Sequence, residues 1–300
     1  MHKNLKKATT ILTFIVGAVF ITFHSSAQRI LPTVKFDLPD NNFSITYIGH
    51  ATTLIHLDGV NILTDPNFSE RVAWLFKRHA APGIAFDNLP EINAIIISHE
   101  HSDHLDESTL CKFEKDIPVI ISRGLGSEIK ELNFQDVREL AWWEKTVIKG
   151  IEITAVPAEH DATASGYIIH GSKTTYFAGD TGIFPALRDI AKQFDIDVVL
   201  LPIGGYYPYF PGNLIPSVRN EVRRDHMAPD DIPYALEMLN YPIMIPIHWG
   251  TFKLSGESLE EPIKKLSEIE RENNLGSKIR ILQPGEVFVL DSLKESVGER

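Results

Sequence analysis

The chain has 300 residues, of which 43% are hydrophobic and 23% are charged, and this excludes a largely disordered or fibrous protein. The 29 lysines and arginines against 40 acidic residues give a formal net charge of −11, so we expect no nucleic-acid partner. A single cysteine excludes an internal disulfide and a cysteine-based zinc site, whereas the chain has twelve histidines.

The first 27 residues have the pattern of a secretory signal peptide. Three lysines precede residue 8, residues 11–23 are mainly apolar, and residues 25–27 (Ser-Ser-Ala) are small, as cleavage requires. The apolar stretch is short for the roughly 20 residues that span a bilayer. We therefore expect cleavage and export to the periplasm or cell envelope, with an uncleaved membrane tether as the alternative. Cleavage would remove three lysines and no acid, changing the net charge from −11 to −14.

From residue 43 onward the chain alternates between short apolar segments and turns. Strands are predicted where β-branched and aliphatic residues cluster, and helices where apolar residues recur every three or four positions. The expected strands are residues 44–48, 53–57, 61–64, 94–98, 118–122, 146–149, 152–156, 167–170, 174–178, 198–202, 243–247, 279–282 and 287–290. The expected helices are residues 106–113, 185–194, 229–239 and 257–273. This order fits an α/β fold with two mixed sheets between helices, a four-layer αββα sandwich.

No repeat or Pro/Ser/Gly-rich linker interrupts this pattern. We therefore expect one domain at residues 43–291. It would be preceded by a lead-in at 28–42 and followed by a polar tail at 292–300.

Residues 99–104 read His-Glu-His-Ser-Asp-His and directly follow the strand predicted at 94–98. His99 and His101 alternate, so both imidazoles are expected to point one way, while Asp103 and His104 turn toward a second point. Neutral imidazoles and carboxylate oxygens are ligands of zinc and of harder first-row metals. The motif therefore predicts a metal site, and the alternative is a polar surface loop.

Three further candidate ligands follow other predicted strands. His160 comes after the strand at 152–156, Asp180 after the strand at 174–178, and His248 after the strand at 243–247. Each is ambiguous alone, because a single histidine after a strand is often structural. Their recurrence at strand ends predicts that they join the 99–104 motif.

Together these motifs resemble the metallo-β-lactamase fold hydrolases over residues 43–291. Shorter motifs are similar to the N-acylphosphatidylethanolamine-hydrolysing phospholipase D branch, with ascorbate-phosphate lactonase-like proteins as neighbouring relatives. These motifs are Gly-His-Ala-Thr-Thr-Leu at 49–54, Leu-Thr-Asp-Pro at 63–66, and Ile-His-Trp-Gly-Thr-Phe at 247–252.

The resemblance implies a site with two divalent metal ions. Zinc is the expected metal, and manganese and iron are the alternatives. One metal would be held by His99, His101 and His160, the other by Asp103, His104 and His248, with Asp180 bridging the two. Such a pair would supply a bridging hydroxide and polarise a phosphoryl or carbonyl oxygen. Asp103 could hydrogen-bond that hydroxide and take its proton.

The resemblance also gives roles to two other residues. His226 would face the substrate phosphate, or alternatively form a hydrogen bond where the next helix begins. Asp65 would lie behind the metal ligands and fix the tautomer of a histidine, or alternatively cap a turn. His50 is expected to be structural at a turn, with a hydrogen bond to a ligand left open, and His56, His79 and His170 are expected in sheets or on the surface.

The expected activity is hydrolysis of a phosphodiester, such as that of an N-acylphosphatidylethanolamine-like phospholipid, with peripheral membrane contact. The alternatives are a lactonase or ester hydrolase, and a non-catalytic metal-binding protein. Residues 160–166 are small and polar where the family has a bulky residue, and residues 206–224 form a longer loop that begins with an aromatic stretch at 206–217. That loop would suit an acyl chain or pack as a lid, so the sequence leaves the substrate open. It also leaves the oligomeric state open, with a dimer as one alternative.

Overall fold

The structure is a computed structural model that describes residues 36–39, 41–209 and 212–290. These residues belong to one compact unit. The predicted signal segment and the predicted tail lie outside the described residues, and both stay predictions, as do the domain boundaries at 43 and 291. Within the described ranges, every helix is too short or too polar to cross a bilayer.

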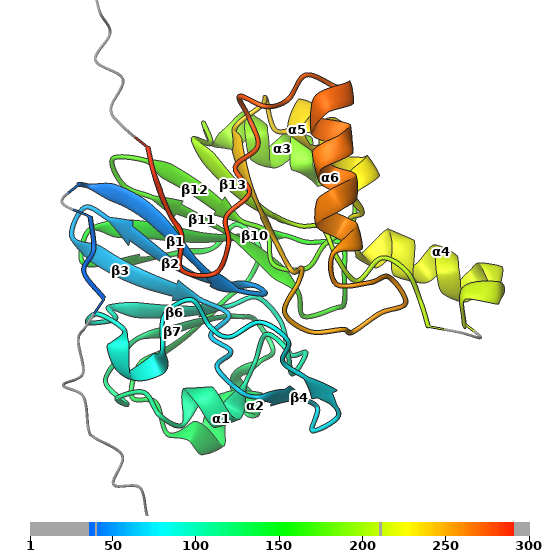
Figure 1. The fold of residues 1–300 in the computed structure, drawn as a ribbon. Coiled ribbons are helices and arrows are strands. Elements are labelled where there is room, and N and C mark those ends of the chain that lie inside the picture. Colours follow the sequence, from blue (N-terminus) through cyan, green and yellow to red (C-terminus); the bar gives the residue numbers. More distant parts are fainter. Residues whose placement is uncertain (1–35, 40, 210–211, 291–300) are drawn as a thin grey trace, which may run out of the picture. The chain divides into compact units, whose positions relative to one another are not determined.

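The first large sheet has seven strands in the order β15-β1-β2-β3-β6-β7-β8 (Figure 1). Neighbouring strands are antiparallel among β15, β1, β2 and β3, and they are parallel among β3, β6, β7 and β8. The bounds are β1 Phe43–Gly49, β2 Thr52–Leu57, β3 Val60–Thr64, β6 Ala94–Ile97, β7 Val119–Ser122, β8 Val137–Leu140 and β15 Val287–Val289. Because β3 and β6 are parallel, the residues that follow them lie side by side.

The second large sheet has six strands in the order β14-β13-β12-β11-β10-β9. Here β12, β13 and β14 run parallel, and the other neighbours are antiparallel. The bounds are β9 Lys145–Ile148, β10 Ile151–Pro157, β11 Ser165–His170, β12 Thr174–Phe177, β13 Val198–Pro202 and β14 Ile243–Ile247. A separate hairpin joins β4 (Arg71–Val72) to β5 (Phe76–Lys77).

The strands are buried on both faces because successive side chains enter different cores. In β6, Ile96 packs between the two sheets, whereas Ile95 packs beneath α1 (Glu107–Leu110) and α2 (Gly126–Ile129). The second sheet is covered on its outer face by α3 (Ala186–Gln193), α5 (Ile232–Met238) and α6 (Glu261–Glu272) (Figure 1). The mixed α/β fold expected from the sequence is confirmed, with helices on the outer face of each large sheet.

Several expected elements differ from those observed. The strand expected at 279–282 is reduced to an isolated bridge between Ile279 and Met244. The helix expected at 257–273 begins only at Glu261, since Pro262 favours the first turn. The long loop expected at 206–224 contains α4 (Pro216–Asp225). That helix carries few apolar residues, so no amphipathic period revealed it.

The helices expected at 106–113 and 229–239 are also shorter than predicted. The first is a single turn, α1, and the second divides into a 3-10 turn, Pro229–Asp231, followed by α5. Strands β4, β5 and β8 were not expected, because each is short and half of its residues are charged.

Candidate metal centre

The carboxyl ends of strands from both sheets meet at one edge of the fold. Strand β6 leads into His99, and β10, β12 and β14 lead toward His160, Asp180 and His248. Gly179, with φ of +61°, lets the second sheet approach the first: a Cβ there would lie 2.5 Å from Ser98 Cβ. The fold therefore brings together candidate ligands that are far apart in the sequence.

One half of the cluster contains three imidazoles. His99 Nε2 lies 3.0 Å from His101 Nδ1, which lies 3.1 Å from His160 Nε2. On the far side of its ring, His160 Nδ1–H donates to the Asp225 carbonyl at 3.0 Å, which leaves a lone pair on Nε2 facing the other two rings. Half of the His101 side chain is exposed, so this half opens to solvent.

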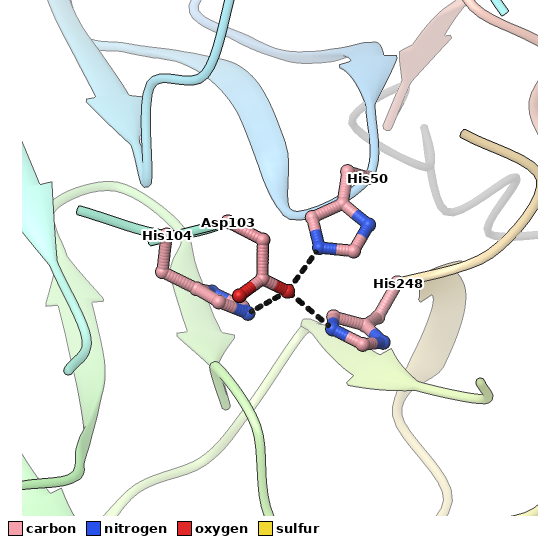
Figure 2. A group of neighbouring side chains, drawn as sticks. All are labelled: His50, Asp103, His104 and His248. Carbon is pink, nitrogen blue, oxygen red and sulfur yellow. Dashed lines mark hydrogen bonds and ion pairs between the residues drawn. The ribbon is translucent and has the colours of Figure 1, made fainter. Parts of the chain in front are cut away.

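The other half is buried and is centred on the Asp103 carboxylate (Figure 2). Its Oδ2 lies 2.8 Å from His50 Nε2, 3.2 Å from His248 Nε2 and 3.4 Å from His104 Nε2. Figure 2 shows the three rings converging on this oxygen from different segments of the chain.

Asp65 lies behind His104 and orients its ring. His104 Nδ1–H donates to Asp65 Oδ2 at 2.6 Å, so the other nitrogen, Nε2, points toward Asp103 and Asp180. The Ser98 amide and hydroxyl also donate to Asp65, at 2.7 and 2.6 Å. This network fixes the tautomer that leaves His104 Nε2 available to a metal.

Asp180 lies between the two halves. Its Oδ2 is 3.2 Å from His104 Nε2, 3.1 Å from His248 Nε2 and 3.7 Å from His226 Nε2. Its Oδ1 and His104 Nε2 are buried yet form no hydrogen bond within the described residues. Burying a polar atom without a hydrogen-bond partner costs free energy, and a bound cation would be a suitable partner for both atoms.

The donor atoms are close enough to bind metal ions. In four overlapping sets, one donor atom from each residue lies within 4.8 Å of the others. The sets are His50, Asp103, His104 and His248; His99, His101, His160 and Asp161; His99, His104 and Asp180; and His160, Asp180 and His226. The structure thus brings together all seven ligands expected from the sequence, in a His/Asp cluster that could hold metal.

Burial and neighbouring charges shift the pKa values of these groups in opposite directions. Burial lowers the pKa of His50 to about 3 and that of His226 to about 4. Burial opposes ionisation of Asp180, but His248 and His104 hold its pKa well below the usual range. Burial also opposes protonation of His248, but Asp180 and Asp103 raise its pKa to about 9. The carboxylate therefore stays charged, as a cation site requires.

A cavity of about 380 Å³ opens onto the cluster. His101, Asp103, Asp180, His226 and His248 form its polar wall. The remaining wall is mostly apolar or aromatic and includes Val72, Ala73, Phe76, Tyr207, Pro208, Tyr209, Val222 and Leu254. A larger cavity of about 680 Å³ near Phe86 contains no histidine, and none of the four donor sets lies in its wall.

His50 has a larger part in the cluster than its sequence context predicts. It lies in the left-handed region with φ of 58°, its amide donates to Thr251 Oγ1, and its carbonyl accepts from the His248 amide. These bonds hold its ring against Asp103. The Gly-His-Ala motif at 49–51 was the signal that could have indicated this position.

Comparisons with known proteins agree with this geometry. The family model described as "Beta-lactamase superfamily domain" matches residues 60–249, more than half of the chain. An uncharacterised protein of Mycobacterium tuberculosis is 29% identical over 246 residues, covering 75% of this chain and 63% of that protein. The chain thus spans less than two thirds of that relative.

Two further relatives have descriptive names. The N-acyl-phosphatidylethanolamine-hydrolyzing phospholipase D 1 of Caenorhabditis elegans is 28% identical over 275 residues, covering 81% of this chain and 74% of its own. A UPF0173 metal-dependent hydrolase of Methanopyrus kandleri is 28% identical over 265 residues, and the match covers 81% of this chain and 98% of that protein.

The fold is also similar to solved structures. A possible metal-dependent hydrolase from Veillonella parvula superimposes with a TM-score of 0.70 at 19% identity, covering 83% of this chain and 100% of that one. At this identity the likeness concerns the fold alone.

Proposed function

This chain belongs to the metallo-β-lactamase superfamily, and from that premise we propose that it is a metal-dependent hydrolase. We propose that it binds two divalent metal ions and that both are zinc rather than manganese or iron. The observation that carries the proposal is a pair of buried atoms, His104 Nε2 and Asp180 Oδ1, that form no hydrogen bond within the described residues. Their side chains belong to one donor set. The names of the worm and archaeal relatives support the same class of activity.

The proposed ligand sets follow the two halves of the cluster. His99, His101 and His160 would hold one metal, and Asp103, His104 and His248 the other, with Asp180 between them. When bound, such a pair generates a nucleophile from water at neutral pH and polarises the oxygen of the substrate. Together the two sets provide five imidazoles and two carboxylates, a donor set that suits zinc, manganese or iron.

Two side chains are proposed to act on the substrate and on protons. His226 donates through Nδ1–H to the Val222 carbonyl at 3.2 Å, so its neutral ring presents an unprotonated Nε2 toward Asp180. Since burial lowers the pKa of His226 to about 4, that nitrogen can accept a hydrogen bond from a substrate or water at neutral pH. Asp103 would hold the attacking water and receive its proton, and its contacts with His50 and His248 orient it for this.

We propose a phosphodiester as the substrate, with a phospholipid of the N-acylphosphatidylethanolamine kind as the specific case. The apolar side of the cavity, including Phe76, Tyr207 and Tyr209, offers surface for acyl groups beside the polar wall. The name of the worm relative supports the same choice.

A substrate panel tests this assignment. The zinc-reconstituted chain should hydrolyse bis-p-nitrophenyl phosphate and release phosphatidic acid from N-acylphosphatidylethanolamine, and it should leave lactones intact. Turnover of lactones without turnover of either phosphodiester would overturn the proposal in favour of a lactonase or ester hydrolase. Metal binding without turnover of any substrate would favour a non-catalytic metal-binding protein.

The location of the protein is a separate proposal. The pattern of residues 1–27 supports export to the periplasm or cell envelope. Amino-terminal sequencing of the protein recovered from cells would test it: a chain beginning near residue 28 supports export with cleavage, and a chain retaining residues 1–27 in the membrane fraction supports a tether.

A further inference from the structure

The β4–β5 hairpin presents two large apolar side chains to solvent. At its tip Trp74 is 84% exposed and Leu75 is 57% exposed. No other large hydrophobic side chain among those described is as exposed as Trp74. Adjacent apolar side chains left uncovered to this extent indicate an interaction surface.

The backbone of the tip holds these side chains outward. Ala73 and Trp74 both lie in the left-handed region, with φ of 45° and 54°. Residues other than glycine adopt this conformation at a cost that the surrounding structure must offset. The Leu75 amide closes the turn by donating to the carbonyls of Val72 and Ala73, at 3.1 and 2.6 Å.

Two cations flank the apolar tip. Arg71 and Lys77 face each other across the hairpin, and both are exposed. Arg71 Nη1 donates to the Leu75 carbonyl at 3.3 Å, which brings the guanidinium toward the tip. Glu70, the nearest acid in the sequence, lies one pair further from the tip, where its carbonyl accepts from the Arg78 amide. A cationic site in a chain of net charge −11 complements an anionic surface.

The same hairpin forms one wall of the cavity at the candidate metal centre. Val72, Ala73 and Phe76 line that cavity together with His101 and Asp103. The Phe76 ring also stacks on Tyr209, with ring centroids 6.5 Å apart. Whatever contacts the tip is therefore held next to the cavity.

We propose that the β4–β5 hairpin docks onto the surface of an anionic phospholipid bilayer. Trp74 and Leu75 enter the interfacial layer, where aromatic side chains are favoured, while Arg71 and Lys77 contact lipid phosphates. The inference rests on the proposed function in one respect: docking brings a lipid substrate to the cavity. Binding itself does not require hydrolysis, so the two can be tested apart.

Co-sedimentation of the full chain with vesicles tests the surface. Vesicles of phosphatidylglycerol with phosphatidylcholine should bind wild type more tightly than vesicles of phosphatidylcholine alone. The double variant Trp74→Asn with Leu75→Ser should bind about tenfold more weakly, because the apolar tip is lost. Asparagine tolerates the left-handed backbone, so the turn is kept. Binding equal to that of wild type would overturn the proposal.

Tyr241→Asn is the matched control. Tyr241 is also aromatic, 44% exposed and left-handed with φ of 57°, but it precedes β14, at the opposite end of that strand from His248. Its variant should bind vesicles as wild type does. An equal loss in this control and in the Trp74 and Leu75 variant would show that the effect is not specific to the hairpin and would overturn the proposal.

Two further measurements address the charges and the insertion. Arg71→Gln with Lys77→Gln should abolish the preference for phosphatidylglycerol, and a preference that persists would contradict the role of the cations. Brominated phospholipids should quench more fluorescence in wild type than in Trp74→Phe, and equal quenching would contradict insertion. A dimer in analytical ultracentrifugation that only the Trp74 and Leu75 variant abolishes would assign the tip to a second copy instead.

Hydrolysis assays separate this inference from the proposed function. The Trp74 and Leu75 variant should hydrolyse bis-p-nitrophenyl phosphate at the wild-type rate but vesicle phospholipid at least about tenfold more slowly. If wild type hydrolyses no phosphodiester while vesicle binding still depends on the hairpin, the proposed function fails and the docking surface stands. If the soluble diester is hydrolysed but the hairpin variant binds vesicles as wild type does, only the docking surface fails.

Discussion

Asp180 is the side chain that connects the two halves of the histidine cluster. One of its oxygens lies near His104 and His248, and donor sets that include it reach His99 and His160. We predict that Asp180→Ala abolishes hydrolysis and lowers the metal content of the purified chain, because a shared carboxylate is lost from both sides. Elemental analysis and turnover of bis-p-nitrophenyl phosphate measure this.

Asp197→Asn supplies the comparison for that experiment. Asp197 accepts from Lys173 Nζ at 3.1 Å and from the Thr174 amide at 2.9 Å, and it belongs to none of the donor sets described above. This variant should keep its metal. Undiminished hydrolysis by Asp180→Ala would refute the assignment of Asp180.

His50 is expected to act through Asp103. Its Nε2 lies 2.8 Å from Asp103 Oδ2, and its backbone is fixed by the bond from its amide to Thr251 Oγ1 and the bond from the His248 amide to its carbonyl. Removing a residue that orients a metal ligand costs about tenfold or more in metal affinity, so His50→Gln should weaken zinc binding by about that factor. Competition with a chromophoric chelator measures the affinity.

His56→Gln is the matched control for His50. His56 Nδ1 pairs with Asn61 Oδ1 at 2.7 Å, outside the metal centre. Zinc affinity should be unchanged in this variant, and an equal loss in both variants would argue against a specific role for His50.

At the scale of elements, the close approach of β12 and β6 determines the geometry of the site. Gly179→Ala would place a Cβ 2.5 Å from Ser98 Cβ at a position with φ of +61°. We expect a loss of about 1–3 kcal/mol in the free energy of unfolding, because neither backbone can move without displacing His99 or Asp180. Chemical denaturation measures it.

Gly276→Ala is the corresponding control. The nearest atom to a Cβ at Gly276 would be Glu270 Oε1 at 3.5 Å, which is an ordinary contact. Its free energy of unfolding should change little. A Gly179→Ala variant as stable as wild type would show that the two sheets can separate at this edge without cost.

At the scale of the whole molecule, the buried histidines make the stability of the metal-free chain depend on pH. The unfolded chain protonates His50 and His226 below about pH 6.5, whereas the folded chain does so only near pH 3 and 4. Stability is therefore lost as the pH falls below 6.5. His248 acts in the opposite sense: its pKa of about 9 means that stability is lost as the pH rises from 6.5 through 9.

Thermal unfolding in the presence of EDTA tests this balance. The metal-free chain should melt at the highest temperature near pH 6.5, and at lower temperatures at about pH 5 and about pH 9. A melting temperature that rises steadily across this range would contradict the assigned shifts. Adding zinc near neutral pH should raise the melting temperature, since a ligand of the folded state stabilises it.

Much of the fold was predictable because its strands are local apolar runs. The strand containing Ile95 and Ile96 lacks alternation, as burial on both faces requires, and it is β6 in the structure. Helix α4 was missed because few of its ten residues are apolar. Its place depends on tertiary contacts, such as that between Gly182 and the Arg224 carbonyl, which sequence patterns do not record.

The sequence by itself determined the family resemblance and the seven candidate ligands, because imidazoles and carboxylates that recur directly after buried strands are the donor set of a metal site. Only the tertiary structure decided which atoms face one another. His50 and Asp103 are 53 residues apart, and their contact exists because β1 and β6 end at the same edge of one sheet. The tertiary structure also decided that Trp74 and Leu75 are exposed, since the sequence alone does not distinguish an apolar pair in a core from one at a hairpin tip.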